Sequence, residues 1–140
     1  MGIFLFNKKT KSRRGLFRTE ETQKTPEVVI NHKEGIIKLK GKSIMEDSTK
    51  FYEPILEKLN WYKDHAPDTT RIMIHLDYFN TTASKYLLKI FKSFEELYTK
   101  KKKEVSVLWY YEEGDLDMKY CGEDYSTMLR LPFKLVEVME

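Results

Sequence analysis

The fold is decided by one continuous stretch, TRIMIHLDYFNTTASKYLLKIFKSFEELYTKKKK, at residues 70–103. Its first ten residues are rich in β-branched and aromatic side chains and almost continuously apolar. This pattern is typical of a central strand that is covered on both faces. Alternation along such a strand predicts one face with Ile72, Ile74, Leu76 and Tyr78, and another with Met73, His75, Asp77 and Phe79.

A long amphipathic helix is predicted directly after this strand. Apolar residues recur at spacings of three and four from Ala83 to Tyr98, and Lys100–Lys103 suit the negative end of the helix dipole. Asn and Thr are preferred helix N-caps, because their side-chain oxygens accept N–H groups that the helix leaves free. Thr81 is therefore either only a helix cap or also a phosphorylation switch, and the residues alone leave both interpretations open.

The flanking segments complete an alternating pattern. Residues 27–40 predict a hairpin of two short strands, and a helix follows with Ser48 as its N-cap and Pro67 beyond its end. Strands are predicted at 104–111 and 133–138, with a shorter helix between them. The order β-β-α-β-α-β-α-β predicts a single-domain α/β fold, with a mixed sheet of four or five strands and three helices.

The first 26 residues differ in composition from the rest. Residues 1–19 carry six basic side chains and no acidic one, whereas the remainder carries 19 basic and 22 acidic side chains. We predict a basic, flexible tail over residues 1–26 and a folded domain over residues 27–140. MGIFLF followed by basic residues suits weak contact with a membrane surface, and a solvated extension explains the same composition.

Composition limits the class of protein. The chain has 140 residues, 41% of them apolar, and a single cysteine, Cys121, so it has no internal disulfide and no CxxC pair for zinc. No apolar run approaches the roughly 18 residues that a membrane span needs. We expect a cytoplasmic protein without cofactor or bound metal.

Known catalytic motifs are absent from the sequence. It contains no GxGxxG, GxxxxGK[ST], HExxH or GxSxG pattern. The histidines His32, His65 and His75 stand alone in the sequence, and a lone mid-strand histidine is usually structural. Acidic neighbours do not lower the pKa of Cys121 and so do not make it a nucleophile.

Two further segments have structural explanations. Residues 112–117, EEGDLD, lack the spacing of a calcium-binding loop and predict a solvated turn that caps the next helix. Trp109-Tyr110-Tyr111 could stack on bases, but the surrounding charge is negative, which excludes a nucleic-acid footprint. We interpret these aromatic residues as packing in the core and at its rim.

The position of Asn80-Thr81-Thr82 adds a functional argument. The triplet lies where a predicted central strand ends and a helix begins, and ligands and partners bind at that edge of open α/β sheets. The free N–H groups and the positive end of the helix dipole tolerate a phosphate there. Phosphorylation of Thr81 would add about −1.5 to −2 charges to whatever surface a partner meets.

At these residues the chain resembles the SiaC family of bacterial regulatory phosphoproteins, over about residues 27–138. The resemblance is carried by GIIKLKGKSIMEDSTKFYEPILEKLNWY (35–62), IHLDYFNTTASKYLLKIFKSFEELY (74–98), VSVLWYYEEGDLDMKYCGEDY (105–125) and LPFKLVEV (131–138). Met45 stands where the family usually has Pro, and Thr82-Ala83 replaces the usual Ser-Ser. Neither departure changes the Asn80-Thr81 pair.

The resemblance implies a fold similar to STAS domains and a protein that is not an enzyme. Family members are phosphorylated on a threonine by a histidine-kinase-like ATPase, and a metal-dependent serine/threonine phosphatase removes the phosphate. The unphosphorylated form binds and activates a diguanylate cyclase, which links the switch to cyclic di-GMP and biofilm formation. Thr81 matches the modified threonine, with Thr82 and Ser84 as fallback acceptors.

These arguments leave two functional hypotheses. The first is an adaptor controlled by phosphorylation of Thr81, which acts on a diguanylate cyclase or another effector. Its docking surface would comprise Tyr78, Phe79, Asn80, Thr82 and Lys85. The second is a constitutive scaffold that binds partners through the same surface and is never phosphorylated.

Overall fold

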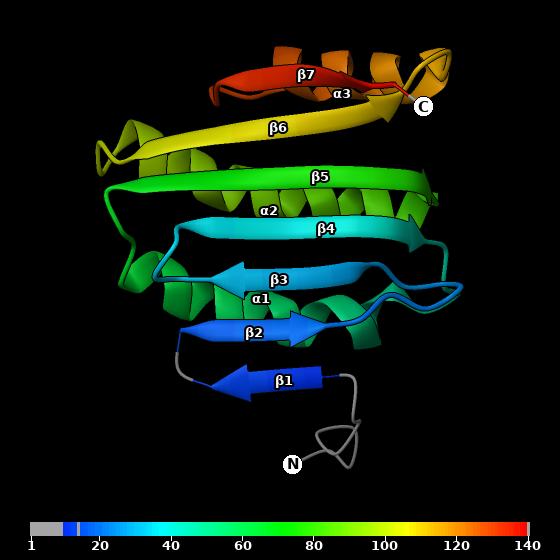
Figure 1. The fold of residues 1–140 in the computed structure, drawn as a ribbon. Coiled ribbons are helices and arrows are strands. Elements are labelled where there is room, and N and C mark those ends of the chain that lie inside the picture. The colour runs from blue at the N-terminus through cyan, green and yellow to red at the C-terminus, as the bar shows by residue number, and fades with distance from the viewer. Residues whose placement is uncertain (1–9, 14, 140) are drawn as a thin grey trace.

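The computed structural model describes residues 10–13 and 15–139, which form a seven-stranded sheet and three helices. In chain order the elements are β1 (Thr10–Arg13), β2 (Leu16–Thr19), β3 (Glu27–Asn31), β4 (Ile36–Ser43), α1 (Ser48–Asp64), β5 (Thr69–Phe79), α2 (Thr81–Thr99), β6 (Glu104–Glu112), α3 (Leu116–Met128) and β7 (Phe133–Val138). The strands lie in the sheet in the same order (Figure 1).

The sheet is mixed, as predicted. Strands β1 to β4 are joined by antiparallel pairs, whereas β4, β5, β6 and β7 are parallel neighbours. Each parallel connection contains one helix, because a crossover between parallel strands needs a dozen or more residues. The predicted order of strands and helices from residue 27 onward is therefore confirmed.

The predicted strand count was too low, and part of the predicted tail lies in the sheet. Strand β2 pairs with β3, with Phe17 opposite Ile30, and Phe17 packs against the core. Residues 20–26 are also held, since the amide of Ile44 donates to the Lys24 carbonyl at 2.9 Å. The basic side chains in this segment made it resemble a solvated tail, so sequence analysis missed the two short strands β1 and β2. MGIFLF, the proposed membrane-contact segment, lies outside the described residues.

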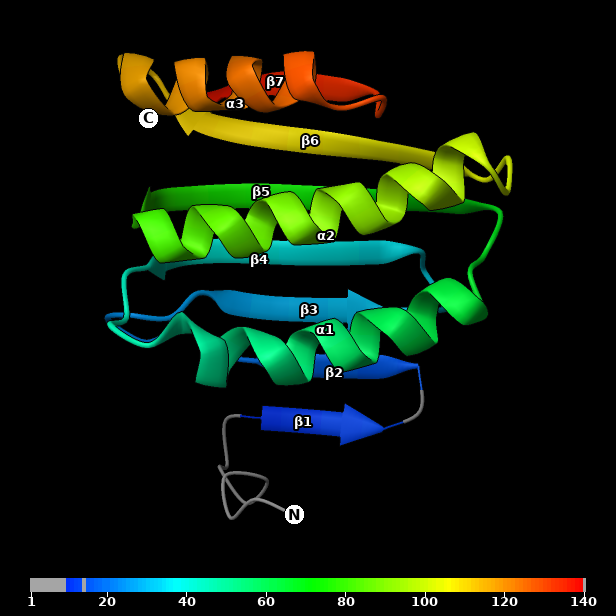
Figure 2. The same ribbon diagram turned by 180° about the vertical axis from the view of Figure 1, so that it is seen from behind.

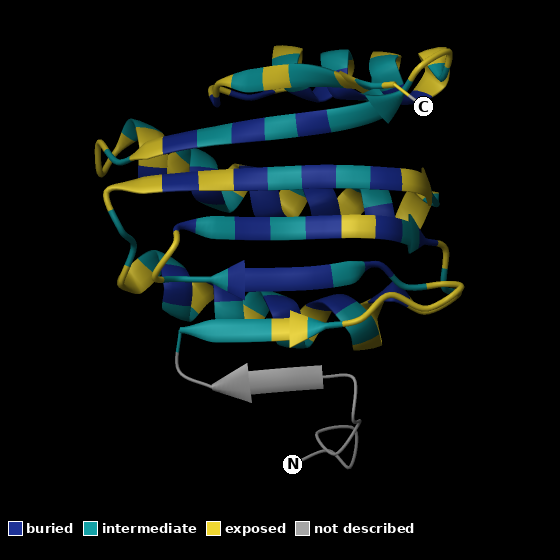
Figure 3. Ribbon diagram, in the orientation of Figure 1, coloured by how far each residue is buried: buried dark blue, intermediate teal, exposed yellow. Residues whose placement is uncertain are grey.

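All three helices lie on one face of the sheet, as Figures 1 and 2 show from opposite sides. The prediction that β5 is covered on both faces was therefore wrong. Ile72, Ile74 and Leu76 are buried under the helices, whereas Met73 and His75 on the open face are only half-buried. Figure 3 shows this alternation of buried and less buried residues along β5.

The core lies between the sheet and the helices. Its largest fully buried side chains include Trp109, Tyr52, Tyr62, Phe91 and Phe94. The buried phenols are hydrogen-bonded, as buried polar groups require: Tyr52 shares a 2.7 Å bond with Ser43, and Tyr62 shares one of 2.7 Å with Thr70. None of the helices within residues 15–139 is both long and apolar enough to cross a bilayer.

A bulge in β5 changes the faces of its last residues. Gly41 of β4 pairs with Leu76, but the next residue, Lys42, pairs with Tyr78, so Asp77 is an extra residue in β5. The predicted alternation fails at this point, because one inserted residue exchanges the two faces. Tyr78 therefore joins the open face, and Phe79 turns toward the helices.

Helix α1 differs from its prediction at its first turn. Asp47 is the N-cap, and its side chain accepts a hydrogen bond from the amide of Thr49 at 3.1 Å. Ser48, the predicted cap, is the first helical residue and is fully buried. Both residue types cap helices well, and the sequence alone did not distinguish between the two neighbours.

Candidate functional site

The carboxyl ends of β4, β5, β6 and β7 meet at one edge of the sheet, on the right of Figure 1. In open α/β sheets this edge is where ligands and partners bind. Helices α1, α2 and α3 all begin there, so the first turns of three helices lie beside the ends of these strands, on one face of the sheet. We call this the carboxyl edge of the sheet.

Asn80 joins three elements at the carboxyl edge. Its Oδ1 accepts a hydrogen bond from the amide of Ala83 at 2.9 Å, which caps α2. Its Nδ2 donates to the carbonyl of Met45 at 3.0 Å, in the loop between β4 and α1. Its own amide donates to the Ser43 carbonyl at 3.0 Å. Asn80 thus fixes the start of α2 against the end of β4.

Thr81 is the first residue of α2 and is not its cap. Its side chain is exposed, and so is that of Thr82. Because Asn80 performs the capping, the Thr81 hydroxyl is not needed to start the helix. Thr81 is therefore not the cap of α2, and its role as a phosphorylation switch stays a prediction.

Ser84 is a poorer acceptor than the two threonines. It is half-buried, and its Oγ donates to the Thr81 carbonyl at 2.6 Å. Its own carbonyl accepts a hydrogen bond from the buried Tyr125 phenol at 3.1 Å. A kinase that modified Ser84 would have to displace these contacts, whereas Thr81 and Thr82 already face solvent.

The five predicted docking residues are not all placed on the surface. Tyr78 is 66% exposed, and Thr82 and Lys85 are also exposed. Phe79 instead turns inward after the bulge, where its ring meets Trp109 edge-on at 6.0 Å between centroids. Asn80 is half-buried and occupied by its three hydrogen bonds. Phe79 and Asn80 therefore support the surface rather than form it.

The structure adds apolar residues that the sequence analysis missed. Ile44 after β4, and Leu116 and Tyr120 in the first turns of α3, are large, apolar and exposed near the ends of β4 and β6. Large exposed apolar side chains that gather on one surface mark interaction sites. Their positions after different strands gave no sequence signal, since only the topology brings them to the same edge.

The aromatic segment at the end of β6 packs as predicted. Trp109 is fully buried, and its Nε1 donates to the Met118 carbonyl at 2.9 Å. Tyr110 and Tyr111 are half-buried at the rim. Asp115 in the acidic turn caps α3, accepting from the amide of Met118 at 3.1 Å, so the interpretation of that turn as a cap is also confirmed.

Cys121 has the character predicted for it. Burial raises the pKa of its thiol, and the nearby carboxylates of Asp124, Asp117 and Asp115 raise that pKa further. A raised pKa leaves the thiol protonated near neutral pH, and the thiolate is the reactive form. The geometry of α3 therefore gives Cys121 no activation as a nucleophile.

The histidines do not stand alone in space. Nε2 of His75 donates to Oε2 of Glu112 at 2.9 Å, and the His75 ring stacks on Tyr110 at 5.4 Å. Asp77 completes a group in which the ligand atoms of all three side chains lie within 4.8 Å of one another. Sequence reasoning missed this group because Glu112 lies on the neighbouring strand.

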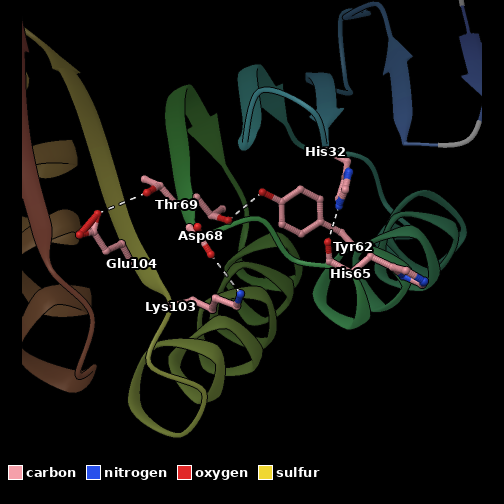
Figure 4. A network of polar contacts seen from close by, with 8 residues as sticks. His32, Tyr62, His65, Asp68, Thr69, Lys103 and Glu104 are labelled. Carbon is pink, nitrogen blue, oxygen red and sulfur yellow. Dashed lines mark hydrogen bonds and ion pairs between the residues drawn. The ribbon is translucent and has the colours of Figure 1, made fainter.

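The other two histidines belong to the opposite end of the sheet. Figure 4 shows a polar network there, in which His32 bonds to the His65 carbonyl and Thr69 bonds to Glu104 at 3.3 Å. Lys103 approaches Asp68 at 3.4 Å in the same region. These contacts join the turns that precede β4, β5 and β6. They position the strands and leave the carboxyl edge as the candidate site.

Comparisons with known proteins bear on the family and the fold of the chain. Residues 19–138 match the family described as SiaC family regulatory phosphoprotein. Among solved structures, SiaC of Pseudomonas aeruginosa has a TM-score of 0.79 at 20% identity, with 88% of this chain and 98% of that chain covered. The apo form of the same protein has a TM-score of 0.78, at 20% identity and with 86% and 98% coverage.

A further solved structure holds a complex. It contains the diguanylate cyclase SiaD with its activator SiaC, both from Pseudomonas aeruginosa, and has a TM-score of 0.81 at 20% identity, with 86% of this chain and 98% of that chain covered. At this identity the structural likeness establishes the fold. A search of curated proteins by sequence found no match. The family match covers most of the chain, which therefore belongs to the SiaC family of regulatory phosphoproteins.

Proposed function

We propose that the protein is a non-enzymatic regulatory adaptor, switched by reversible phosphorylation of Thr81. The unphosphorylated form binds and activates a partner, and phosphorylation releases that partner. One observation carries the proposal: Thr81 is exposed at the first position of α2 while Asn80 performs the capping. A kinase can therefore reach the hydroxyl, and its loss or modification does not remove the cap.

A phosphate at this position would change the surface rather than unfold the helix. It would add about −1.5 to −2 charges and three strong acceptor oxygens. The positive end of the α2 dipole favours a negative group there, so the helix itself tolerates the modification. A partner that docks over the exposed Tyr78 and Thr82 would meet a new, solvated double negative charge. Desolvation of that charge would oppose binding.

The proposed partners follow from family membership. We assign the effector to the diguanylate cyclases, in line with the solved complex of SiaD and its activator SiaC. The exposed apolar residues Ile44, Tyr78 and Leu116 suit a protein partner at the carboxyl edge. A histidine-kinase-like ATPase would add the phosphate and a metal-dependent phosphatase would remove it. We place the switch in the cytoplasm, where the kinase has access to ATP.

The proposal is tested by comparing phosphorylated and unphosphorylated protein. Affinity for a diguanylate cyclase from the same cells, and the rate of cyclic di-GMP synthesis, are measured with both forms. Thr81→Asp is compared with Thr82→Asp, which places the same charge one residue further along α2. We expect phosphorylated protein and Thr81→Asp to lose at least tenfold in affinity, and Thr82→Asp to lose less.

Two results would contradict the proposal. Equal affinity of the phosphorylated and unphosphorylated forms for the cyclase would show that Thr81 does not control docking. Unchanged regulation of the cyclase in cells that carry Thr81→Ala would favour the constitutive scaffold, which binds through the same edge without modification.

A further inference from the structure

We propose that His75, Asp77 and Glu112 form a binding site for a divalent transition-metal ion such as Zn²⁺, on the open face of the sheet. One imidazole nitrogen and two carboxylate oxygens all lie within 4.8 Å of one another. These are ordinary zinc ligands, and three protein ligands leave a position for water or a partner group. None of these three residues takes part in the proposed phosphorylation of Thr81.

The distances suit an ion after small movements of side chains. Ligand atoms around a tetrahedral zinc lie about 3.4 Å apart, given metal–ligand distances of about 2.0–2.2 Å. Nε2 of His75 and Oε2 of Glu112 are 2.9 Å apart, so an ion would replace the hydrogen bond that now joins them. Asp77 is exposed, and its ligand atom lies within 4.8 Å of the other two, a distance that exceeds the tetrahedral spacing by at most about 1.4 Å.

The two carboxylates have no strong cationic partner in the described part of the chain. Within residues 15–139, Asp77 forms no ion pair, and the partner of Glu112 is His75, which carries a charge only when its imidazole is protonated. Lys40 lies opposite His75 in the β4–β5 register, yet it makes no ion pair with either carboxylate. Two nearby negative charges around one imidazole repel each other, and a dication would relieve that repulsion.

The surrounding structure orients the ligands. The ring of Tyr110 stacks on His75 at an interplanar angle of 25°, which restrains the imidazole. Asp77 is the extra residue of the β5 bulge, and bulges next to functional sites serve to redirect a side chain. Without the bulge, the strand would keep its regular alternation and Tyr78 would lie under the helices. The bulge therefore places Tyr78 on the open face, where regular alternation already places His75 and Asp77 together.

The donor set favours some ions over others. An imidazole nitrogen suits zinc, nickel and related transition metals, whereas Mg²⁺ prefers oxygen ligands in octahedral geometry. A bound ion would connect the ends of β5 and β6, directly beside the exposed Tyr78 at the carboxyl edge. The expected role is a clamp that stiffens this edge.

The test is calorimetric titration of untagged, full-length protein with Zn²⁺, in a buffer without chelators, and with Mg²⁺ in parallel. The variants are His75→Ala, Asp77→Asn and Glu112→Gln, of which the last two preserve side-chain shape and keep the fold intact. His65→Gln is the matched control, because it removes a histidine at the opposite end of the sheet. Thermal unfolding is followed with and without Zn²⁺ for each protein.

We expect one Zn²⁺ to bind per chain, with a rise in melting temperature, because an ion that binds only the folded state stabilises it. Each of the three variants should weaken Zn²⁺ binding by at least about tenfold, the scale of losing one supporting group at a metal site. His65→Gln should bind like the wild type, and Mg²⁺ should bind much more weakly. Absence of saturable Zn²⁺ binding, or binding that survives all three substitutions, would overturn the proposal.

Discussion

Asn80 donates a hydrogen bond from its Nδ2 to the carbonyl of Met45 at 3.0 Å, and so ties the start of α2 to the loop after β4. The same side chain caps α2 through Ala83. One residue thereby joins the loop after β4 to the helix that carries Thr81. This matters for the proposed switch, because a functional site is most precise when secondary contacts fix the element that carries it.

The double role of Asn80 can be separated by two substitutions. Asn80→Ala removes both contacts and should lower the free energy of unfolding by about 1–2 kcal/mol, the usual cost of losing a cap. Asn80→Ser keeps a side-chain oxygen that caps helices well and loses the donor to Met45, so it should cost less. Urea denaturation of both variants measures the difference. Equal stability of wild type and Asn80→Ala would show that the cap contributes nothing.

Because the bulge at Asp77 exposes Tyr78 and turns Phe79 inward, we expect substitutions of these two residues to differ in their effect on stability and on partner binding. Tyr78→Ala removes an exposed ring and should change the free energy of unfolding by less than about 0.5 kcal/mol. Phe79→Ala removes a half-buried ring that packs on Trp109 and should cost about 1–3 kcal/mol, below the cost of about 3–5 kcal/mol for a fully buried ring. Tyr78→Ala should instead weaken partner binding. Chemical denaturation and a binding titration are carried out on both variants. A larger loss of stability in Tyr78→Ala than in Phe79→Ala would contradict the bulge.

Gly122 in α3 is predicted to tolerate no larger side chain. A Cβ at this position would lie 2.4 Å from Cδ1 of Trp109 and 2.7 Å from Cδ2 of Leu135. Gly→Ala in a helix normally stabilises by up to about 1 kcal/mol, but overpacking a core costs about 1–3 kcal/mol. We expect Gly122→Ala to be destabilising. Asp124→Ala, at an exposed position of the same helix, serves as the control in thermal denaturation.

Ionisation of the buried Tyr52 phenol should lower the free energy of unfolding at alkaline pH. Burial raises the pKa of its phenol to about 12, and the hydrogen bond to Ser43 opposes that rise. The unfolded chain ionises near 10, so the stabilisation is complete below pH 10 and is lost as the pH rises toward 12. A shift of this size corresponds to about 2–3 kcal/mol.

Urea denaturation at pH 8 and at pH 11 measures this effect, with Tyr52→Phe as the control. The variant has no phenol at this position to ionise, so its loss of stability over the same interval should be smaller. A residual loss is expected, because burial also raises the pKa of Tyr125 to about 12. An equal loss in the wild type and Tyr52→Phe would contradict the assignment to Tyr52.

Much of the fold could be predicted from periodicity, because long elements repeat their signal many times. The apolar face of α2, from Ala83 to Leu97, is buried as its 3.6-residue period predicts. The four-residue strand β2 offered only Leu16 and Phe17 against a basic background, which is too short a signal to separate a strand from a tail. Short elements depend on the partners that the rest of the chain provides.

The candidate site was predicted less completely than the fold. Thr81 and Asn80 could be located because strand, cap and helix are adjacent in sequence. The exchange of faces of Tyr78 and Phe79 after the bulge could not be predicted, since one extra residue in a strand leaves the local composition unchanged. The contact between His75 and Glu112 spans 37 positions and is created only by the parallel pairing of β5 and β6. Contacts of this kind can be predicted only once the order and direction of the strands in the sheet are known.

The most direct test of the central claim is intact-mass and fragment mass spectrometry of the protein after incubation with ATP and a lysate of its source cells. Wild type, Thr81→Ala and Thr82→Ala are compared, with a known kinase substrate in the same lysate as the positive control. We predict one phosphate on the wild type and on Thr82→Ala, mapped to Thr81, and none on Thr81→Ala. An unmodified wild type beside a labelled control substrate, or equal labelling of Thr81→Ala, would contradict the account.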